Sequence, residues 1–258
     1  MIPDAHCHLA DLPDPGASID AAWKAGVGPI LGVAMAPADA EVVMRMRDLH
    51  PGGVLAGVGL HPSRVPGLTD AQIDAEIGIL EGRAADADFI GEIGLDFKDA
   101  TDAAQQARQR ETLVRLLEVA AAAGRPVNLH TRRADRLLVS TAAEFTRRTG
   151  IAALLHWFTH SIPLAAECAR AGLYISAGPS ILSDPLQADV ARAIDGDLLL
   201  VETDSPVVYA GAAARPDWAV RVAGRLAALR GETPDEMAAR LSRNLARYLG
   251  KLTPSGGG

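Results

Sequence analysis

The chain begins MIPDAHCHLADL, and its first candidates for chemistry are the histidines His6 and His8. Side chains in a β-strand alternate between the two faces, so these imidazoles point the same way and Cys7 points the opposite way. Asp11 and the turn-forming sequence LPDPG follow closely. Two imidazoles on one face at the end of a strand can chelate a metal ion. The structural alternative is one histidine in the core and one exposed.

More residues of the same chemical types follow short β-like runs further along the chain. They are His61, Glu92, Asp96, His130, His156, Glu202 and Asp204. A lone buried histidine or carboxylate is usually a hydrogen-bonded structural residue, but burying so many together is costly unless cations neutralise them. The candidate metal ligands are His6, His8, Glu92, His130, His156 and Asp204.

Six such ligands exceed what one four-coordinate site needs, so we expect two divalent metal ions with Glu92 as the bridge. A shared carboxylate lets two ions polarise a substrate oxygen and lower the pKa of a shared water. Mixed imidazole and carboxylate ligands suit zinc, manganese, nickel or magnesium, so the identity of the metal stays open.

The elements that must position these residues are eight β-like runs, each followed by a segment with helical periodicity. They are IPDAHCHL, GPILGVAM, VLAGVGLHP, DFIGEIGLD, RPVNLHT, AALLHWF, GLYISAG and DLLLVETD. Alternating strands and helices imply parallel pairing, and eight units in 258 residues predict an α/β fold, a single-domain (β/α)8 TIM barrel. A doubly wound open sheet is the alternative.

The chemical residues fall at the carboxyl ends of these runs, where TIM barrels carry their active sites. Capping-box spacings predict helix starts at Thr69 and Thr233. We expect the barrel over residues 1–251 and a flexible C-terminal tail over 252–258, where the sequence reads TPSGGG at its end.

Six motifs carry a resemblance to a known family: DAHCHL, GVGLHP, GEIGLDF, PVNLHTRRA, LHWFT and VETDSP. In this order, over nearly the whole chain, they resemble the signatures of the TatD family of metal-dependent hydrolases and DNases, within the amidohydrolase superfamily. The resemblance implies a TIM barrel with a dinuclear site. It implies one metal at His6, His8, Glu92 and Asp204, and another at Glu92, His130 and His156. It also implies that Asp204 orients or deprotonates the attacking water.

The chain departs from the family pattern in two segments on the substrate side. It reads HWFTH where the family commonly has H-C-F-[ST]-G, which puts Trp157 and His160 in place of Cys and Gly. After VETDSP, the segment VVYAGAAARPDW is short and lacks the usual Asn. The resemblance therefore supports the metal chemistry more strongly than it supports the identity of the substrate. We expect Trp157 in the core if its strand continues, and His160 at the pocket, where it can contact substrate, or on the surface.

Besides His160, four side chains are candidates for holding the substrate. A proline directly after His61 restricts the turn and fixes the imidazole over the rim, where we expect contact with a substrate oxyanion rather than with a metal. Arg132 and Arg133 follow a ligand strand and can clamp a phosphate, the alternative being a helix-start ion pair with Asp135. Arg64 is a further candidate of this kind.

Composition limits the partners. A net charge of −7 argues against non-specific coating of nucleic acid or of an acidic membrane, so a nucleic-acid substrate must be held locally. Cys7 and Cys168 are far apart and in no metal-like spacing, which favours a reducing compartment. The sequence shows neither a signal-like segment nor a long apolar run, so we expect a cytoplasmic protein without membrane contact.

These observations predict a metal-dependent phosphodiesterase that hydrolyses DNA ends or small nucleotides with metal-activated water, in which Asp204, Glu92 and His61 do the chemistry. One alternative is a hydrolase that uses the same metals to cleave an acyl or amide bond, as relatives that deacylate D-aminoacyl-tRNA do. Another is a TatD-like subunit of a defence or repair complex. A homo-oligomer is also possible.

Overall fold

The computed structural model describes residues 1–250, and eight parallel strands form one sheet with the order β1-β2-β3-β4-β5-β6-β7-β8. The strands are β1 (Ile2–Cys7), β2 (Val27–Gly32), β3 (Val54–Val58), β4 (Phe89–Asp96), β5 (Val127–Arg132), β6 (Ala153–Leu155), β7 (Tyr174–Ala177) and β8 (Leu199–Val201). Each matches one of the predicted runs, so the predicted TIM barrel is confirmed. The predicted tail, residues 252–258, lies outside the described residues.

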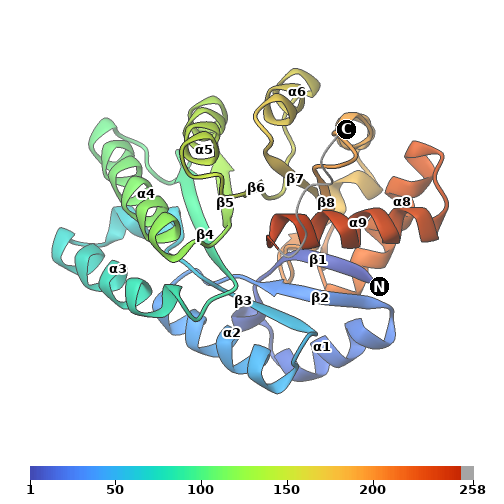
Figure 1. Ribbon diagram of the computed structural model, residues 1–258, viewed down its shortest axis with the longest axis horizontal. Coiled ribbons are helices and arrows are strands. Elements are labelled where there is room, and N and C mark those ends of the chain that lie inside the picture. Colours follow the sequence, from blue (N-terminus) through green and yellow to red (C-terminus); the bar gives the residue numbers. More distant parts are fainter. Residues whose placement is uncertain (251–258) are drawn as a thin grey trace.

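Helices surround the strands on the outside of the barrel (Figure 1). They are α1 (Pro15–Lys24), α2 (Pro37–Leu49), α3 (Asp70–Ala84), α4 (Ala103–Ala123), α5 (Asp135–Thr149), α6 (Ile162–Arg170), α7 (Pro185–Ala193), α8 (Ala219–Arg230) and α9 (Pro234–Tyr248). Thr69 and Thr233 begin α3 and α9 with complete capping boxes, so both predicted helix starts are confirmed. Within residues 1–250, no helix combines the length and the apolar character needed to cross a membrane.

The barrel closes between β1 and the segment that follows β8. The backbone N–H of Asp204 donates to the carbonyl of His6 at 3.0 Å, and the N–H of His8 donates to the carbonyl of Ser205 at 2.8 Å. These bonds lie beyond the last residue of β8. The closure therefore brings the His-x-His motif beside the VETDSP motif, two segments from opposite ends of the chain.

Two hydrophobic cores hold the barrel together. The larger lies between the strands and the surrounding helices and includes the buried thiols of Cys7 and Cys168. The smaller fills the barrel itself with inward-facing side chains such as Leu31 and Phe89. Helix α9 completes it, because Tyr248 packs edge-on against Tyr174, the first residue of β7. The amino-terminal end of the barrel is thereby closed, which leaves the opposite end for the site.

The backbone at the carboxyl ends of three strands is unusual. Arg133, Trp157 and Asp204 have φ angles of +59°, +44° and +50°, in the left-handed region that side chains other than glycine rarely adopt. Such conformations persist where the surrounding structure enforces them, often at functional sites. A short hairpin of β9 (Val208–Tyr209) and β10 (Ala212–Ala213) follows the last of these residues.

Candidate metal centre

The polar residues predicted from the sequence converge on one side chain, Glu92 of β4. This carboxylate is only 1 % exposed and lies in the longest strand of the barrel. Neighbouring strands bring imidazoles and one further carboxylate around it, because the carboxyl ends of parallel strands meet at one end of a barrel. His6 comes from β1, His130 from β5, and His8, His61, His156 and Asp204 from the turns that directly follow their strands.

One oxygen of Glu92 faces the histidines of the first strand. Its Oε2 lies 3.4 Å from His6 Nε2 and 3.5 Å from His8 Nε2, and these two nitrogens are 3.3 Å apart. Asp204 joins the same group, with its Oδ1 3.1 Å from His8 Nε2 and 3.6 Å from His6 Nε2. The first group therefore contains His6, His8, Asp204 and one oxygen of Glu92.

The other oxygen of Glu92 faces a second group of imidazoles. Its Oε1 lies 2.8 Å from both His130 Nδ1 and His156 Nε2, which are 3.1 Å from each other. His61 Nε2 approaches the same oxygen at 3.3 Å. Glu92 thus stands between two sets of nitrogen atoms and offers one oxygen to each.

Hydrogen bonds on the far side of each imidazole indicate which nitrogen is free to bind a cation. His6 Nδ1 lies 2.9 Å from Asn128 Oδ1, and Asn128 is oriented by donating its Nδ2 to the carbonyl of Ala5. The amide oxygen accepts only, so His6 Nδ1 carries the proton and Nε2 presents a lone pair. His130 Nε2 faces the Asp96 carboxylate at 3.2 Å, so in the neutral ring the proton lies on Nε2 and Nδ1 is the nitrogen with a lone pair toward Glu92.

His156 differs, because its buried Nδ1 has no hydrogen-bond partner within residues 1–250. This nitrogen faces Glu202 Oε1 at 3.5 Å, and Nε2 is the nitrogen that faces Glu92. Glu202 is held in turn by the backbone N–H of Trp157 at 2.7 Å and by the Ser176 hydroxyl. Glu202 therefore lies behind His156, on the side of the imidazole that faces away from Glu92.

His61 differs from the other imidazoles. The backbone N–H of Ser63 donates to its Nδ1 at 3.1 Å, so in the neutral ring the proton lies on Nε2, the nitrogen that faces Glu92. Burial, the largest effect, lowers the pKa of His61 despite the nearby charge of Glu92. A neutral imidazole with its N–H turned inward is a hydrogen-bond donor, and the expected contact of His61 with a substrate oxygen stays a prediction.

The electrostatics of the other groups show how the cluster tolerates burial. Burial disfavours the charge on Glu92, but the surrounding imidazoles outweigh it and hold its pKa well below the usual value. Burial likewise opposes the charged form of His8, yet the hydrogen bond to Asp204 and the charge of Glu92 raise its pKa to about 9. The pKa of His156 is raised well above normal by Glu92 and Glu202 against the same burial. Protons on the imidazoles thus balance the buried carboxylates.

The donor set fits divalent cations. Three groups within residues 1–250 place their ligand atoms close enough together to hold an ion: His6 with His8 and Glu92, His61 with Glu92 and His130, and His6 with His156 and Glu202. Glu92 Oε2 is buried without a hydrogen-bond partner in this part of the chain. Buried carboxylates and histidines without other partners are the ligands that transition metals take in proteins.

The two arginines predicted to contact phosphate, Arg132 and Arg133, have different surroundings. Arg132 donates to Asp96 and Asp99, its Nη2 lying 2.6 and 3.0 Å from their carboxylate oxygens. The alternative pairing of this arginine with Asp135 is therefore wrong: Asp135 faces His160 instead, at 3.4 Å. Arg133 makes no ion pair with any residue of 1–250.

Two further candidates lie at the edge of the site. Arg64 pairs with Glu76 at 3.1 Å on the outer side of the rim. His160 is half-buried and its ring packs edge-on against Phe158, 4.9 Å between centroids. Arg64 is thus paired, whereas His160 Nε2 is buried without a hydrogen-bond partner within residues 1–250, and contact of either residue with a substrate stays a prediction.

Two supporting residues escaped the sequence analysis or were undervalued there. Asn128 was not singled out, although it stands two residues before His130 and therefore shares its face of β5. Asp96 was noted only as a rim residue, whereas it contacts both His130 and Arg132. The prediction that Trp157 packs in the core is wrong, because β6 ends at Leu155 and the side chain is half-buried at the rim.

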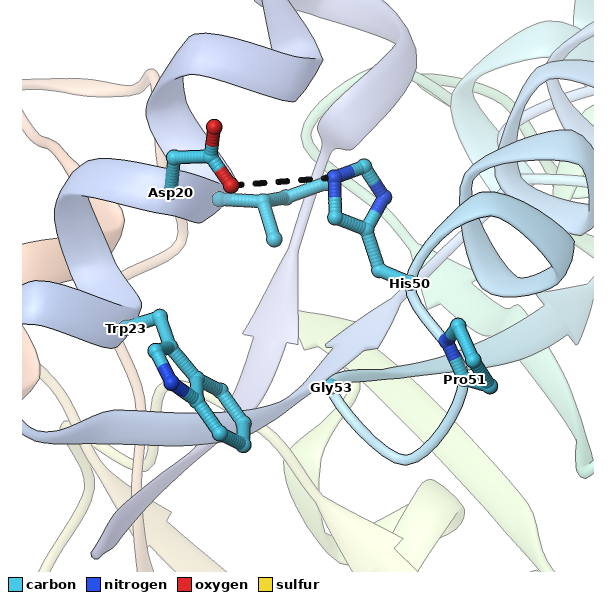
Figure 2. A pocket seen from close by; sticks show the side chains of 6 residues that line it. Asp20, Trp23, His50, Pro51 and Gly53 are labelled. Carbon is cyan, nitrogen blue, oxygen red and sulfur yellow. Dashed lines mark ion pairs between the residues drawn. The ribbon is translucent and has the colours of Figure 1, made fainter.

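A separate pocket lies away from this centre (Figure 2). It has a volume of about 220 Å³ and is lined by Ile19, Asp20, Trp23, His50, Pro51 and Gly53. Gly53 directly precedes β3 and Trp23 lies at the end of α1, so the pocket is at the amino-terminal end of the barrel. Its His50 approaches Asp20 only at 4.0 Å. Nothing in it continues the chemistry of the metal centre.

A TIM barrel with imidazoles and carboxylates converging at the carboxyl ends of its strands defines the class of barrel-shaped metal-dependent hydrolases. Residues 3–250 match the model of the TatD related DNase family. The chain therefore belongs to that family, as its motifs predicted.

Individual relatives agree with this assignment. The chain is 29 % identical to human deoxyribonuclease TATDN3, covering 96 % of this chain and 94 % of the relative. It is 33 % identical to the uncharacterized metal-dependent hydrolase YjjV of Escherichia coli K12, covering 93 % of this chain and 95 % of YjjV. The crystal structure of YjjV, a TatD homologue, superposes with a TM-score of 0.85 and covers 98 % of each chain at 30 % identity.

A more distant solved structure extends the same fold. The TatD family hydrolase from Entamoeba histolytica matches with a TM-score of 0.81 at 16 % identity, covering 96 % of this chain and 97 % of that one. At this identity the likeness concerns the barrel alone. The arrangement of strands that positions the site is therefore maintained while most side chains differ.

Proposed function

We propose that this protein is a phosphodiesterase that hydrolyses DNA or nucleotide phosphodiesters with two divalent cations, one on each oxygen of Glu92. The observation that carries the proposal is that Oε1 and Oε2 of this one carboxylate face separate groups of imidazoles. A bridging carboxylate of this kind is typical of two-metal hydrolytic sites. The family and the names of the relatives, among them a human deoxyribonuclease, support the phosphodiester as substrate.

In this proposal His6, His8 and Asp204 hold the first cation, His130 and His156 hold the second, and Glu92 holds both. Cations held there would supply Lewis-acid chemistry, polarising a phosphoryl oxygen and bringing the pKa of a water near neutrality. In this proposal, side chains of the protein carry out the proton transfer. Asp204 accepts the water proton, because its carboxylate is 14 % exposed whereas Glu92 is sealed at 1 %. Zinc, manganese, nickel and magnesium all suit the ligand types.

His61 and Arg133 complete the proposed site on the substrate side. The inward Nε2–H of His61 can donate to a phosphoryl oxygen as negative charge builds on it. Arg133 follows β5, has no ion pair within residues 1–250 and can meet a phosphate with two parallel hydrogen bonds. Two free, buried cysteines agree with a reducing, cytoplasmic setting for this reaction.

The bridging role is tested with Glu92→Gln, in which an amide replaces one anionic oxygen at almost unchanged volume. We expect the metal content to fall from two ions per chain to one or none, and kcat/KM on a single-stranded oligonucleotide to fall by at least about a thousandfold. Metal content is measured by mass spectrometry after dialysis against limiting metal. Glu118→Gln, an exposed site on α4, is the matched control and should change neither quantity.

The substrate class needs a parallel assay. The wild-type protein, loaded with each metal in turn, is given a phosphodiester, a phosphomonoester and an acyl ester under the same conditions. We expect the phosphodiester to be preferred. Turnover of the acyl ester alone would overturn the phosphodiesterase assignment, and two bound metals in Glu92→Gln would overturn the bridging role.

A further inference from the structure

We propose that Trp157 and Tyr209 form a platform on which the base next to the scissile phosphate stacks, so that this enzyme recognises its substrate by a nucleobase as well as by its phosphate. The inference rests on the proposed phosphodiesterase function and names what determines specificity at that site. Neither residue has a part in the metal chemistry described above. The pair is called the aromatic platform below.

The position of Trp157 ties the aromatic platform to the metal centre. It directly follows His156, and its backbone N–H donates to Glu202, the carboxylate behind that histidine. The φ angle of +44° breaks the strand alternation that would have buried the ring. The half-buried ring instead lies over Gly178 at the end of β7, where an added Cβ would come within 3.0 Å of it. A large apolar ring therefore stands at the mouth of the site.

Tyr209 is fixed beside it from another element. This half-buried residue belongs to β9, and its ring centre lies 6.2 Å from that of Trp157 with an angle of 64° between the planes. Its hydroxyl donates to the carbonyl of Ser180 at 3.2 Å and lies 2.7 Å from Ser183 Oγ. The hairpin is thus anchored to the segment after β7. Two rings held at a fixed angle lose little freedom when a flat ligand stacks on them.

The charges around the site favour recognition of the base. Arg132 is held by two carboxylates and Arg64 by one, and the whole chain carries a net charge of −7. Phosphate contacts alone therefore offer little binding energy beyond the cations and Arg133. Aromatic stacking does not depend on charge and every base has a flat face, so it can hold a nucleotide on an acidic protein.

The experiment compares two substrates that differ only in the base. One is thymidine 5′-(4-nitrophenyl phosphate), and the other is the same phosphodiester built on abasic deoxyribose, so both break the same bond and release 4-nitrophenolate. We expect the wild-type protein to prefer the thymidine compound by about tenfold in kcat/KM, mostly through KM. Trp157→Gly should lower this ratio to about one while leaving the abasic compound within twofold. Glycine accepts the positive φ, so the backbone at this position stays relaxed.

Two more variants sharpen the result. Tyr209→Leu should also reduce the base preference, since it removes one ring and its anchor. Trp23→Leu is the matched control: this tryptophan is 51 % exposed and borders the pocket at the other end of the barrel (Figure 2), so its loss should leave the ratio unchanged. A ratio near one in the wild type, or a high ratio that survives both Trp157→Gly and Tyr209→Leu, would overturn the inference. Equal losses on both substrates would assign Trp157 to support of His156 and overturn it as well.

A binding measurement separates this inference from the proposed function. Thymidine monophosphate is titrated into chelated protein carrying Trp23→Phe and Trp218→Phe, so that Trp157 is the only tryptophan that can report. Quenching of its fluorescence that is saturable and lost in Tyr209→Leu supports the aromatic platform even if no phosphodiester is hydrolysed. Failure of the wild-type protein to cleave either substrate, with quenching intact, would overturn the hydrolytic assignment alone. Absence of quenching would overturn the platform alone.

Discussion

At the scale of single residues, the contact behind each imidazole distinguishes the proposed metal ligands from the proposed hydrogen-bond donor. His6, His130 and His156 each turn one nitrogen to an oxygen of Asn128, Asp96 or Glu202 and the other to Glu92. His61 has its Nδ1 occupied by a backbone N–H and turns a protonated nitrogen inward. We therefore propose two chemical roles for residues of one type in this cluster, decided by what lies behind the ring.

This distinction predicts different outcomes for two similar substitutions. His61→Asn should lower kcat by about a hundredfold, because a donor to the developing negative charge is lost, while both metals stay bound. His130→Asn should lose metal as well as activity, because it removes a ligand nitrogen. Metal content and steady-state kinetics on the same preparations measure both effects. Loss of metal in His61→Asn would show that its inward nitrogen is a ligand.

Asp96 gives a prediction about stability and pH. Burial alone raises the pKa of Asp96, but hydrogen bonds from His130 and Arg132 outweigh it and keep the pKa well below the ordinary value. A carboxylate with a lowered pKa stabilises the fold above its unfolded pKa of about 4, and that stability is lost as the pH falls toward the folded value. In metal-free protein, Asp96→Asn should therefore cost about 2 kcal/mol of unfolding free energy at pH 7 and less at pH 3. Urea denaturation at both pH values measures this, and an equal loss at both would contradict it.

At the scale of elements, the close approach of β3 and β4 sets the position of the bridging carboxylate. A Cβ at Gly59, directly after β3, would lie 2.5 Å from the backbone N and O of Glu92. Real Cβ atoms do not come so near, so any larger residue must push β4 away. The glycine is required there by its lack of a side chain, since its φ angle is not in the left-handed region.

Gly59→Ala should therefore displace Glu92, lower the metal content and destabilise the protein by about 1 to 3 kcal/mol. The matched control is Gly78→Ala in the exposed face of α3, where an added Cβ meets nothing within 4 Å. That change should stabilise the helix by about 0.5 to 1 kcal/mol. Thermal unfolding and metal analysis of the two variants test the prediction together. Full metal content in Gly59→Ala would show that β4 can shift without moving its carboxylate.

At the scale of the whole molecule, the fold and the metal centre depend on different interactions. The two hydrophobic cores lie between strands and helices and inside the barrel, and they include none of the candidate ligands. Without cations, the raised pKa of His156 and the lowered pKa of Glu92 keep the buried charges paired. The barrel is therefore held by apolar burial, and we expect the proposed cations to govern only the site.

Removal of metal should consequently abolish activity without unfolding the protein. We expect an unchanged far-ultraviolet circular dichroism spectrum after chelation and a fall in Tm of about 10 °C, because ligands that bind only the folded state stabilise it by mass action. Activity should return when metal is added back. Collapse of the spectrum on chelation would mean that the ions are structural.

The sequence by itself determined the elements and the residue types of the site. Strand and helix signals are local, since they depend on alternation, capping residues and the lengths of apolar runs, and all eight predicted strands are present. A barrel of parallel strands then requires their carboxyl ends to meet, so the sequence alone predicts that His6 and Glu92 lie close together.

Only the tertiary structure decided which groups face each other across those ends. The partner of His6 is Asn128, 122 residues away, and Arg132 pairs with residues of the β4 end instead of Asp135. Likewise, the side chain of Trp157 lies at the rim and not in the core as predicted, because this residue has a positive φ. Such pairings depend on the register of neighbouring strands and on backbone geometry at their ends, and no pattern within one short segment encodes them.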